Sequence, residues 1–157
     1  MQFEQKITPF LSFESEAEEA ANFYVSVFPD SEILRVLKNP MNGSVMTVEF
    51  RLADLTFVAL NVGQKWEYTN SISLAIRCDS QDEIDHYWEK FLDGGKEMAC
   101  GWLTDRYGVA WQVVPAPMGE YLGDPDTERA TRVMNVMMTM IKLDFAALKS
   151  AYESDAE

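Results

Sequence analysis

The sequence predicts an α+β fold made of two similar halves and a helical C-terminal region. Each half reads as a strand, a helix and then two or three further strands, and the two helices carry the matching strings NFYVSVF and HYWEKFL. An order of elements that occurs twice in one chain indicates an internal duplication. After Pro117 the apolar spacing becomes helical, which predicts helices for the C-terminal region.

The first half begins with an apolar stretch over residues 6–13, which predicts a strand, and Pro9 within it places the strand near a sheet edge or a bulge. Ser15, with Glu18 three residues later, has the pattern of a capping box and predicts the start of a helix. Pro29 ends that helix. Three strands are then predicted, over residues 31–37, 44–52 and 55–62.

The second half follows the same order. A strand over residues 71–78 precedes Ser80, which together with Glu83 predicts a second capped helix. The apolar residues of this helix recur at helical spacing and are Ile84, Tyr87, Trp88 and Phe91. Two strands, over residues 97–105 and 109–115, complete the half.

The C-terminal region is rich in methionine. Met134, Met137, Met138 and Ile141 form one stripe of a predicted helix, which favours packing in a core or in a dimer interface. Asp144 then predicts the N-cap of a last short helix with the sequence FAALKSAYE.

The excess of acidic residues argues against two classes of partner. The chain has 13 basic and 26 acidic residues, a net charge of −13, and no basic cluster. Phosphate recognition needs concentrated positive charge, so this balance argues against nucleic acid and anionic membranes as partners. No apolar run is long enough to cross a bilayer, and the first residues lack the pattern of a signal peptide.

The two cysteines, Cys78 and Cys100, are far apart and do not form a C-x-x-C motif. We expect two reduced thiols in a cytoplasmic protein, with a disulfide or a reactive thiol as the alternatives.

Four stretches of the chain resemble one known family. ITPFLSF, AEEAANFYVSVFPDS, SISLAIRCDSQDEIDHYWEKFLDGG and CGWLTDRYGVAWQVVP are similar to the PhnB-like branch of the vicinal-oxygen-chelate superfamily, and the similarity extends to about Leu148. That superfamily also includes glyoxalase I, extradiol dioxygenases and fosfomycin-resistance proteins.

The resemblance implies a specific architecture. Two βαβββ modules, residues 6–60 and 72–115, would form one domain over residues 1–117, with a curved sheet around a cup-shaped cleft and helices outside. Residues 118–157 would be a helical extension. The resemblance also implies a homodimer.

Superfamily enzymes hold a divalent metal with histidine and glutamate side chains from four strands. The matching positions here are Thr8, Val58 (or Ala59, because the register is open), Ser73 and Gln112, and none of them is a usual ligand for such a metal. The single histidine, His86, lies on the polar side of the second helix, where we expect it to be solvated. We therefore expect a cleft without metal, and no cofactor.

Successive side chains of a strand point to opposite faces of the sheet, so every second residue shares a face. Gln112 occupies a cleft position of the family, so its face would be concave, and Trp111 would lie in the core together with the apolar face of Ile72, Leu74, Ile76 and Cys78. Cys100 and Trp102 would share one face of the neighbouring strand, and packing of Trp102 under the C-terminal helices is the alternative. The predicted ligand-binding residues are Thr8, Phe10, Ser12, Val58, Ser73, Arg77, Trp102 and Gln112, with Glu49 and Leu60 on the same face.

Two of these residues are charged and have alternative roles. Arg77 could bind a ligand carboxylate or phosphate, or it could pair with Glu49. Glu49, if desolvated, could act as a general base.

The sequence leaves three functions open. The favoured one is binding of a small organic molecule in a metal-free cleft. The alternatives are a metal-independent lyase or isomerase that uses Glu49, and a metal-dependent enzyme with unrecognised ligands. Some relatives are described as ubiquinone-type methyltransferases, but the chain has no G-x-G-x-x-G, P-loop, H-E-x-x-H or G-x-S-x-G motif, and no glycine-rich loop after a strand.

Overall fold

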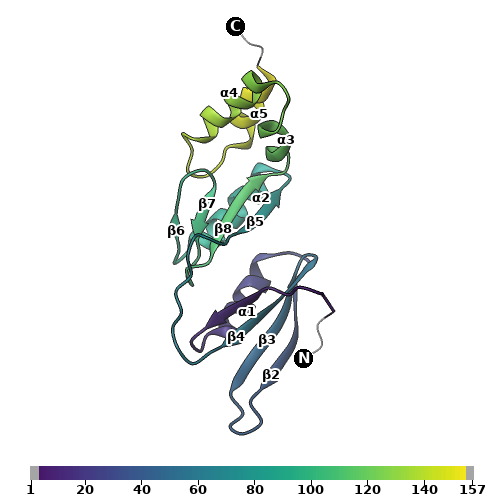
Figure 1. Ribbon diagram of the computed structural model, residues 1–157, viewed down its shortest axis with the longest axis vertical. Helices are drawn as coiled ribbons and strands as arrows, with labels where there is room; N and C mark the ends of the chain where they lie inside the picture. Colours follow the sequence, from purple (N-terminus) through teal and green to yellow (C-terminus); the bar gives the residue numbers. More distant parts are fainter. Residues whose placement is uncertain (1–3, 155–157) are drawn as a thin grey trace. The chain divides into compact units, whose positions relative to one another are not determined.

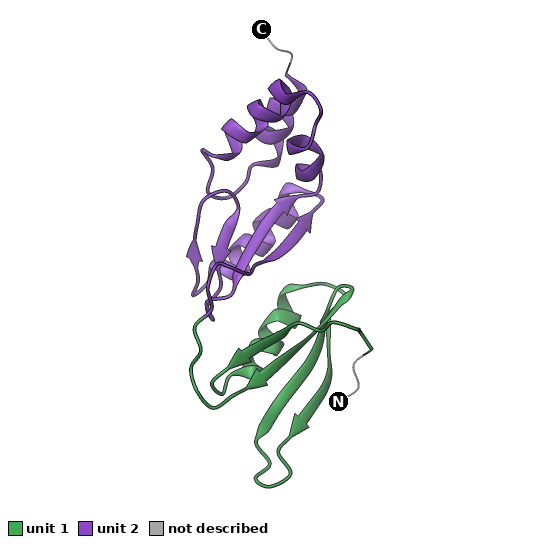
Figure 2. Ribbon diagram, viewed as in Figure 1, with its two compact units in different colours: residues 1–67 green, residues 68–157 purple. Residues whose placement is uncertain are grey.

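In the computed structural model, which describes residues 4–154, strands and helices follow one another in the order that the repeat predicts (Figure 1). The chain divides into two units, residues 1–67 and residues 68–157 (Figure 2). The two predicted modules, 6–60 and 72–115, fall one in each unit. That they form one domain stays a prediction.

Unit 1 is a four-stranded sheet with one helix. Its elements are β1 (Phe10–Phe13), α1 (Ala17–Val27), β2 (Glu32–Lys38), β3 (Val45–Leu52) and β4 (Leu55–Asn61). The strand order is β1-β4-β3-β2, with β1 parallel to β4 and the other pairs antiparallel. This is the βαβββ order of one module, as predicted.

The core of unit 1 lies between α1 and one face of the sheet. The ring of Tyr24 on α1 stacks at 6.1 Å from the ring of Phe50 on β3, and Phe50 stacks at 5.5 Å from Phe57 on β4. All three side chains are buried. Aromatic pairs at these distances bury large apolar areas, so they hold the helix on this face.

The predicted start of α1 is wrong. Ser15 makes no capping bond; instead its backbone N–H donates to the Glu16 carboxylate. The free N–H of Ala17 donates to Oδ1 of Asn61 at 2.9 Å, so the cap comes from the end of β4. A cap supplied from 44 residues away leaves no local pattern. β1 is also shorter than predicted, because it begins at Phe10 and not at residue 6.

Unit 2 repeats the topology. Its first elements are β5 (Leu74–Cys78), α2 (Gln81–Leu92), β6 (Lys96–Glu97), β7 (Trp102–Thr104) and β8 (Ala110–Pro115). The strand order is β5-β8-β7-β6, with β5 parallel to β8. The second module therefore also has the predicted βαβββ order.

The predicted features of α2 are confirmed. Ser80 Oγ accepts the backbone N–H of Glu83 at 3.2 Å, as a capping residue should. The four residues of the apolar stripe are buried, and Phe91 stacks at 4.4 Å on Trp111. Trp111 is only 2% exposed, so it is the core residue that the alternation of side chains predicts.

The predicted strand over residues 97–105 is interrupted. Cys100 has φ 61° and Gly101 has φ 81°, so these residues form a turn between β6 and β7. A side chain at position 101 would meet the Val113 carbonyl at 2.9 Å, which only glycine avoids. Cys100 therefore does not share a strand face with Trp102, contrary to the prediction. Ile72 also departs from its prediction, because it precedes β5 and is 71% exposed.

Three helices end unit 2: α3 (Met118–Leu122), α4 (Thr127–Met137) and α5 (Phe145–Glu153). They enclose a separate core of Met118, Tyr121, Val133, Leu143 and Leu148. Asp144 caps α5, as predicted, by accepting the Ala147 N–H at 2.9 Å. The chain before α5 is tied to the turn at Gly101, whose N–H donates to the Ile141 carbonyl at 2.7 Å.

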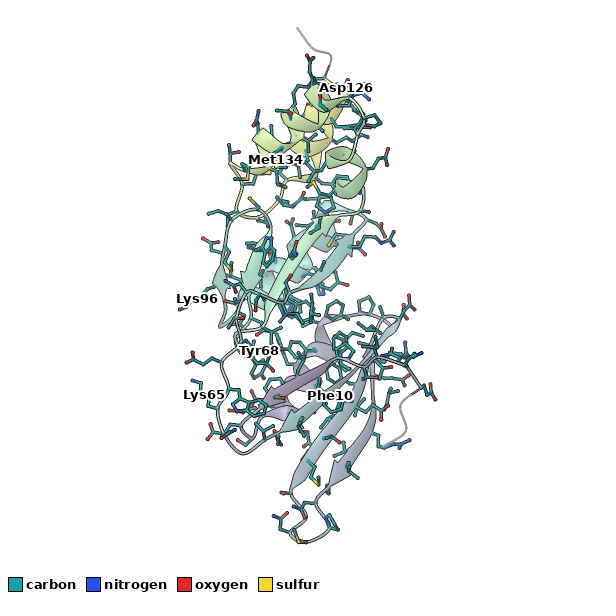
Figure 3. All side chains as sticks on the ribbon, in the orientation of Figure 1. Phe10, Lys65, Tyr68, Lys96, Asp126 and Met134 are labelled. Atoms are coloured by element: carbon teal, nitrogen blue, oxygen red, sulfur yellow. The ribbon has the colours of Figure 1, made fainter. Side chains whose placement is uncertain are left out.

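The methionine stripe divides into two parts. Met137 packs against the core of the C-terminal helices, whereas Met134, on α4 (Figure 3), Met138 and Ile141 are 42%, 62% and 48% exposed. Among residues 4–154, no helix has the length and apolar character that a bilayer crossing requires.

Candidate functional site

Each sheet has a second face, opposite its helix, and we call these the open faces. In unit 1, Val58 pairs with Phe10 of β1 and with Glu49 of β3, so these three side chains share the open face. Ala59 pairs with Val48, on the helix side. The register that the sequence left open is thus decided in favour of Val58.

Further predicted residues lie on the same face of unit 1. Ser12 pairs with Leu60, two residues along each strand from the pair of Phe10 and Val58. Phe10 is 40% exposed although it is aromatic, and Val58 is fully buried. Figure 3 marks Phe10 on β1. Thr8 lies just before β1 and is half-buried.

A hollow of about 240 Å³ opens on this face, and we call it the unit-1 hollow. Its lining consists of Glu4, Gln5, Thr8, Leu34, Arg35, Glu49 and Thr56. One wall is fixed by Gln5, whose amide donates to the Thr56 carbonyl at 3.0 Å and accepts the Thr56 N–H at 2.9 Å. Arg35 is not among the predicted site residues, although it is a charge inside the apolar strand EILRVLK, as Arg77 is in its own strand.

On the open face of unit 2 the structure brings three predicted residues together. Gln112 of β8 pairs with Trp102 of β7 and with Ala75 of β5. The Gln112 amide donates to the Ser73 hydroxyl at 2.9 Å. Trp102, Ser73 and Gln112 are all half-buried, so this part of the face is neither core nor fully solvated.

A second hollow, of about 290 Å³, lies on the same open face and is called the unit-2 hollow. Ala75, Arg77, Gln112 and Val114 of the sheet line it, together with Met118 and Gly119 of α3. Ile76, Pro115 and Ala116 complete the lining, so the hollow also reaches the ends of β5 and β8, whereas Cys78 and Val113 are buried and do not line it.

Arg77 lies at the unit-2 hollow with an acidic neighbour from its own strand end. Its guanidinium lies 3.6 Å from the Asp79 carboxylate, and the two side chains are 75% and 62% exposed. An exposed ion pair of this kind contributes little to stability. Arg77 is therefore available to a ligand at low desolvation cost, and its pairing with Glu49 stays a prediction.

Cys78 and His86 are poor candidates for chemistry. Burial is the main cause that raises the pKa of the Cys78 thiol to about 12, and the negative charge of Glu83 adds to it, so the thiol is protonated at neutral pH. His86 is exposed on α2.

The family's divalent metal does not fit the residues at the matching positions. The Val58 side chain has no donor atom, and the Gln112 amide nitrogen is directed at the Ser73 hydroxyl. Within residues 4–154, no three or more histidine, cysteine, aspartate or glutamate side chains gather where they could hold an ion. That the purified protein lacks a metal stays a prediction.

Comparison with known proteins identifies the family. Residues 5–114, which contain the first module and all but the last residue of the second, match the sequence model of the family described as 3-demethylubiquinone-9 3-methyltransferase. The chain belongs to this family. The match ends at Val114, before the C-terminal helices.

A solved structure from Bacillus cereus supports this assignment. It is described as a PhnB protein and a candidate 3-demethylubiquinone-9 3-methyltransferase, it is 36% identical, and the match covers 71% of this chain and 100% of that chain with a TM-score of 0.66. The resemblance to the PhnB-like branch is thereby confirmed. The search of curated proteins finds no match.

More distant structures share the fold alone. Protein PA1353 from Pseudomonas aeruginosa is 20% identical over 71% of this chain and 97% of its own, with a TM-score of 0.57. The fosfomycin-resistance protein FosX from Listeria monocytogenes is 14% identical over 71% of this chain and 93% of its own, with a TM-score of 0.52.

Proposed function

We propose that this PhnB-like protein binds a small organic molecule on its open sheet faces, without a metal. The observation that supports this most is that each open face combines a hollow with half-buried polar groups and aromatic side chains. Small-molecule sites are usually concave and mostly apolar, with a few polar groups that orient the ligand.

The proposed ligand is a small anionic or carbonyl-bearing molecule. On unit 2, Arg77 offers a solvated guanidinium and Gln112 an amide at the same hollow, while Trp102 lies beside Gln112. A guanidinium binds carboxylate or phosphate with two parallel hydrogen bonds. On the open face of unit 1, Thr8, Phe10 and Ser12 would offer two hydroxyl groups and an aromatic ring to a ligand there, and the fully buried Val58 would support that surface.

A metal-independent lyase or isomerase is the second candidate. Glu49 favours it, because this half-buried carboxylate lines the unit-1 hollow and could accept a proton from a bound substrate.

The methyl transfer in the family's name has less support from the residues. Both strand-to-helix junctions lack glycine and carry acidic residues, Glu14 and Glu16 in one and Asp79 in the other, whereas nucleotide-like cofactors usually bind a glycine-rich loop there.

Benzoate, which combines an aromatic ring with a carboxylate, tests the proposal in an NMR chemical-shift titration. We expect Arg77→Met and Trp102→Ala each to weaken binding about tenfold, a loss of ~1.4 kcal/mol. Arg106→Met is the matched control, because Arg106 pairs with Asp93 and does not line the unit-2 hollow. Equal affinity in all four proteins, or no binding, would contradict the proposal.

The same variants separate the two roles of Arg77. Since Arg77 is exposed, Arg77→Met should leave the free energy of unfolding within about 0.5 kcal/mol of the original value. If Arg77 paired with Glu49 instead, the single variant would be destabilised and adding Glu49→Gln would recover the loss.

We further propose that the protein is a cytoplasmic homodimer. The exposed apolar residues Met134, Met138 and Ile141 support this, because a second copy could cover them. The net charge of −13 and the absence of a basic cluster weigh against nucleic acid or an anionic membrane as a partner.

A further inference from the structure

From the charges on the open face of unit 1 we infer that the unit-1 hollow selects a small zwitterion, a molecule that carries both an ammonium and a carboxylate. This inference rests on the proposed function, since the hollow belongs to the same open face as Phe10 and Val58. It adds Arg35 as a residue that determines specificity, and it gives Glu49 a binding role.

The first support is that opposite charges line one hollow. Arg35 of β2 and Glu49 of β3 are direct partners in the antiparallel pair, so their side chains project from the same face of the sheet. Both line the unit-1 hollow, and Glu4 adds a second carboxylate. Such a hollow presents a carboxylate-binding fork beside groups that attract an ammonium.

The second support is that Arg35 and Glu49 have no side-chain partner among residues 4–67. Across the described part of this unit, the only side-chain ion pair joins Arg51 to Glu32, and neither Arg35 nor Glu49 makes a side-chain hydrogen bond there. Neighbouring opposite charges on paired strands commonly bind each other. Here both remain available to a ligand that brings the complementary charges.

The local structure explains why Arg35 reaches the hollow. The pairing of β2 with β3 shifts register between Ile33 and Arg35, which inserts Leu34 as an extra residue. A bulge of this kind redirects the side chains that follow it. Ile33 pairs with Phe50 on the helix side, whereas Arg35 pairs with Glu49 on the open face.

The remaining lining suits a small polar ligand. Thr8 and Thr56 add hydroxyl groups, and Leu34 adds an apolar contact. The Gln5 amide is already engaged with the Thr56 backbone and serves to hold the wall in place. A volume of about 240 Å³ has room for a short amino acid, but not for a large cofactor.

Three probes of equal carbon number test the inference in the full-length protein: γ-aminobutyrate, which has both charges, butyrate and butylamine. We expect chemical shifts of residues around Arg35 and Glu49 to change with γ-aminobutyrate, and its affinity to exceed that of either single-charge probe by about tenfold. Equal affinity of the three probes, or no binding of γ-aminobutyrate, would overturn the inference.

Single variants of Arg35 and Glu49 should each abolish a different preference among the probes. Residues with only a structural role would not produce this result. Arg35→Met should abolish the preference for γ-aminobutyrate over butylamine while leaving butylamine affinity unchanged. Glu49→Gln should abolish the preference over butyrate while leaving butyrate affinity unchanged. Arg51→Met, which removes an arginine already paired with Glu32, is the matched control and should keep both preferences.

The alternative is that Arg35 and Glu49 bind each other in solution. In that case both single variants would lower the melting temperature, the double variant would recover it, and neither would change the preference among probes; this result would also overturn the inference. Benzoate binding that depends on Arg77, without selective binding of γ-aminobutyrate, would leave the proposed function standing and remove only the zwitterion site.

Discussion

At the scale of single residues, Asp105 shows what strand patterns leave out. Its carboxylate is 3% exposed and accepts the backbone N–H groups of Tyr107 and Val109 and the indole N–H of Trp111, at 2.8, 3.0 and 2.9 Å. A buried carboxylate is stable only with such donors. Asp105 therefore orders the turn before β8 and orients Trp111 in the core, which leaves Gln112 on the open face.

Cys78 gives a prediction at the same scale. Burial opposes the thiolate and raises the pKa of Cys78 in the folded state to about 12, well above the ordinary value of a thiol. The folded state thus retains a proton that the unfolded chain loses, so this contribution to stability is present below about pH 9 and is lost as pH rises. We expect stability to fall with pH above 9, by up to ~1.4 kcal/mol per pH unit.

Urea unfolding between about pH 8 and 9.5 measures this slope before most tyrosine titrates, and the pKa of Tyr87, which burial also raises, is common to all variants. Cys78→Ala should reduce the slope even though it also lowers overall stability by removing a buried side chain. Cys100→Ala is the control and should retain the slope, since Cys100 lies in a turn and is only partly buried. An unchanged slope in Cys78→Ala would contradict the assignment.

At the scale of elements, the two modules begin their helices differently although both sequences have the same capping pattern. Ser80 caps α2 through its own hydroxyl, whereas α1 is capped by Asn61 from β4. The side chain of Asn61 also donates to the Val45 carbonyl at 3.1 Å, so one residue joins α1, β3 and β4. The first helix is therefore started by a tertiary contact and the second by a local one.

A pair of identical substitutions tests this difference. Ser80→Ala should lower the free energy of unfolding by about 1 kcal/mol, because it removes the acceptor for the Glu83 N–H. Ser15→Ala, the matched control, should change it by less than about 0.5 kcal/mol. Asn61→Ala should cost at least as much as Ser80→Ala, since it leaves both the Ala17 N–H and the Val45 carbonyl without their partner. Equal losses for the two serine variants in urea unfolding would refute the tertiary cap.

At the scale of the whole molecule, the C-terminal helices lie outside the region that matches the family. That region, residues 5–114, carries the first module and all but the last residue of the second. The C-terminal helices have their own core but are joined to the second module by the bond from Gly101 to Ile141 and by Gln81, whose amide accepts the Phe145 N–H at 2.8 Å. Their exposed apolar residues are thus held in a fixed place on unit 2.

The homodimer is the prediction at this scale. Light scattering should give close to twice the chain mass of 17.9 kDa. Met138→Glu places a charge on an exposed apolar position and should yield a monomer, because burying an unpaired carboxylate in an interface is costly. Met41→Glu, at a 90% exposed methionine in the β2–β3 turn, is the control and should leave the dimer intact. A stable dimer of Met138→Glu would remove the role of this surface, and a monomeric original protein would refute the dimer itself.

The candidate site could be predicted in part. The alternation of side chains between the two sheet faces predicts that Ser73, Gln112 and Trp102 share one face of the second sheet, because this alternation is a local property of a strand. It could not place Cys100, since the turn at Gly101 depends on close contact with Val113 and Leu143. It also missed Arg35, because the bulge at Leu34 reverses the alternation along β2.

The sequence alone determined the order of elements, the duplication and most of the core, because apolar periodicity and turn signals depend on residues that are close together in the sequence. The tertiary structure decided the register that selects Val58 over Ala59, the cap of α1, and the position of Arg35 opposite Glu49. Each of these depends on contacts between residues far apart in the chain. Their geometry is set only when strands pair, and local patterns carry no record of it.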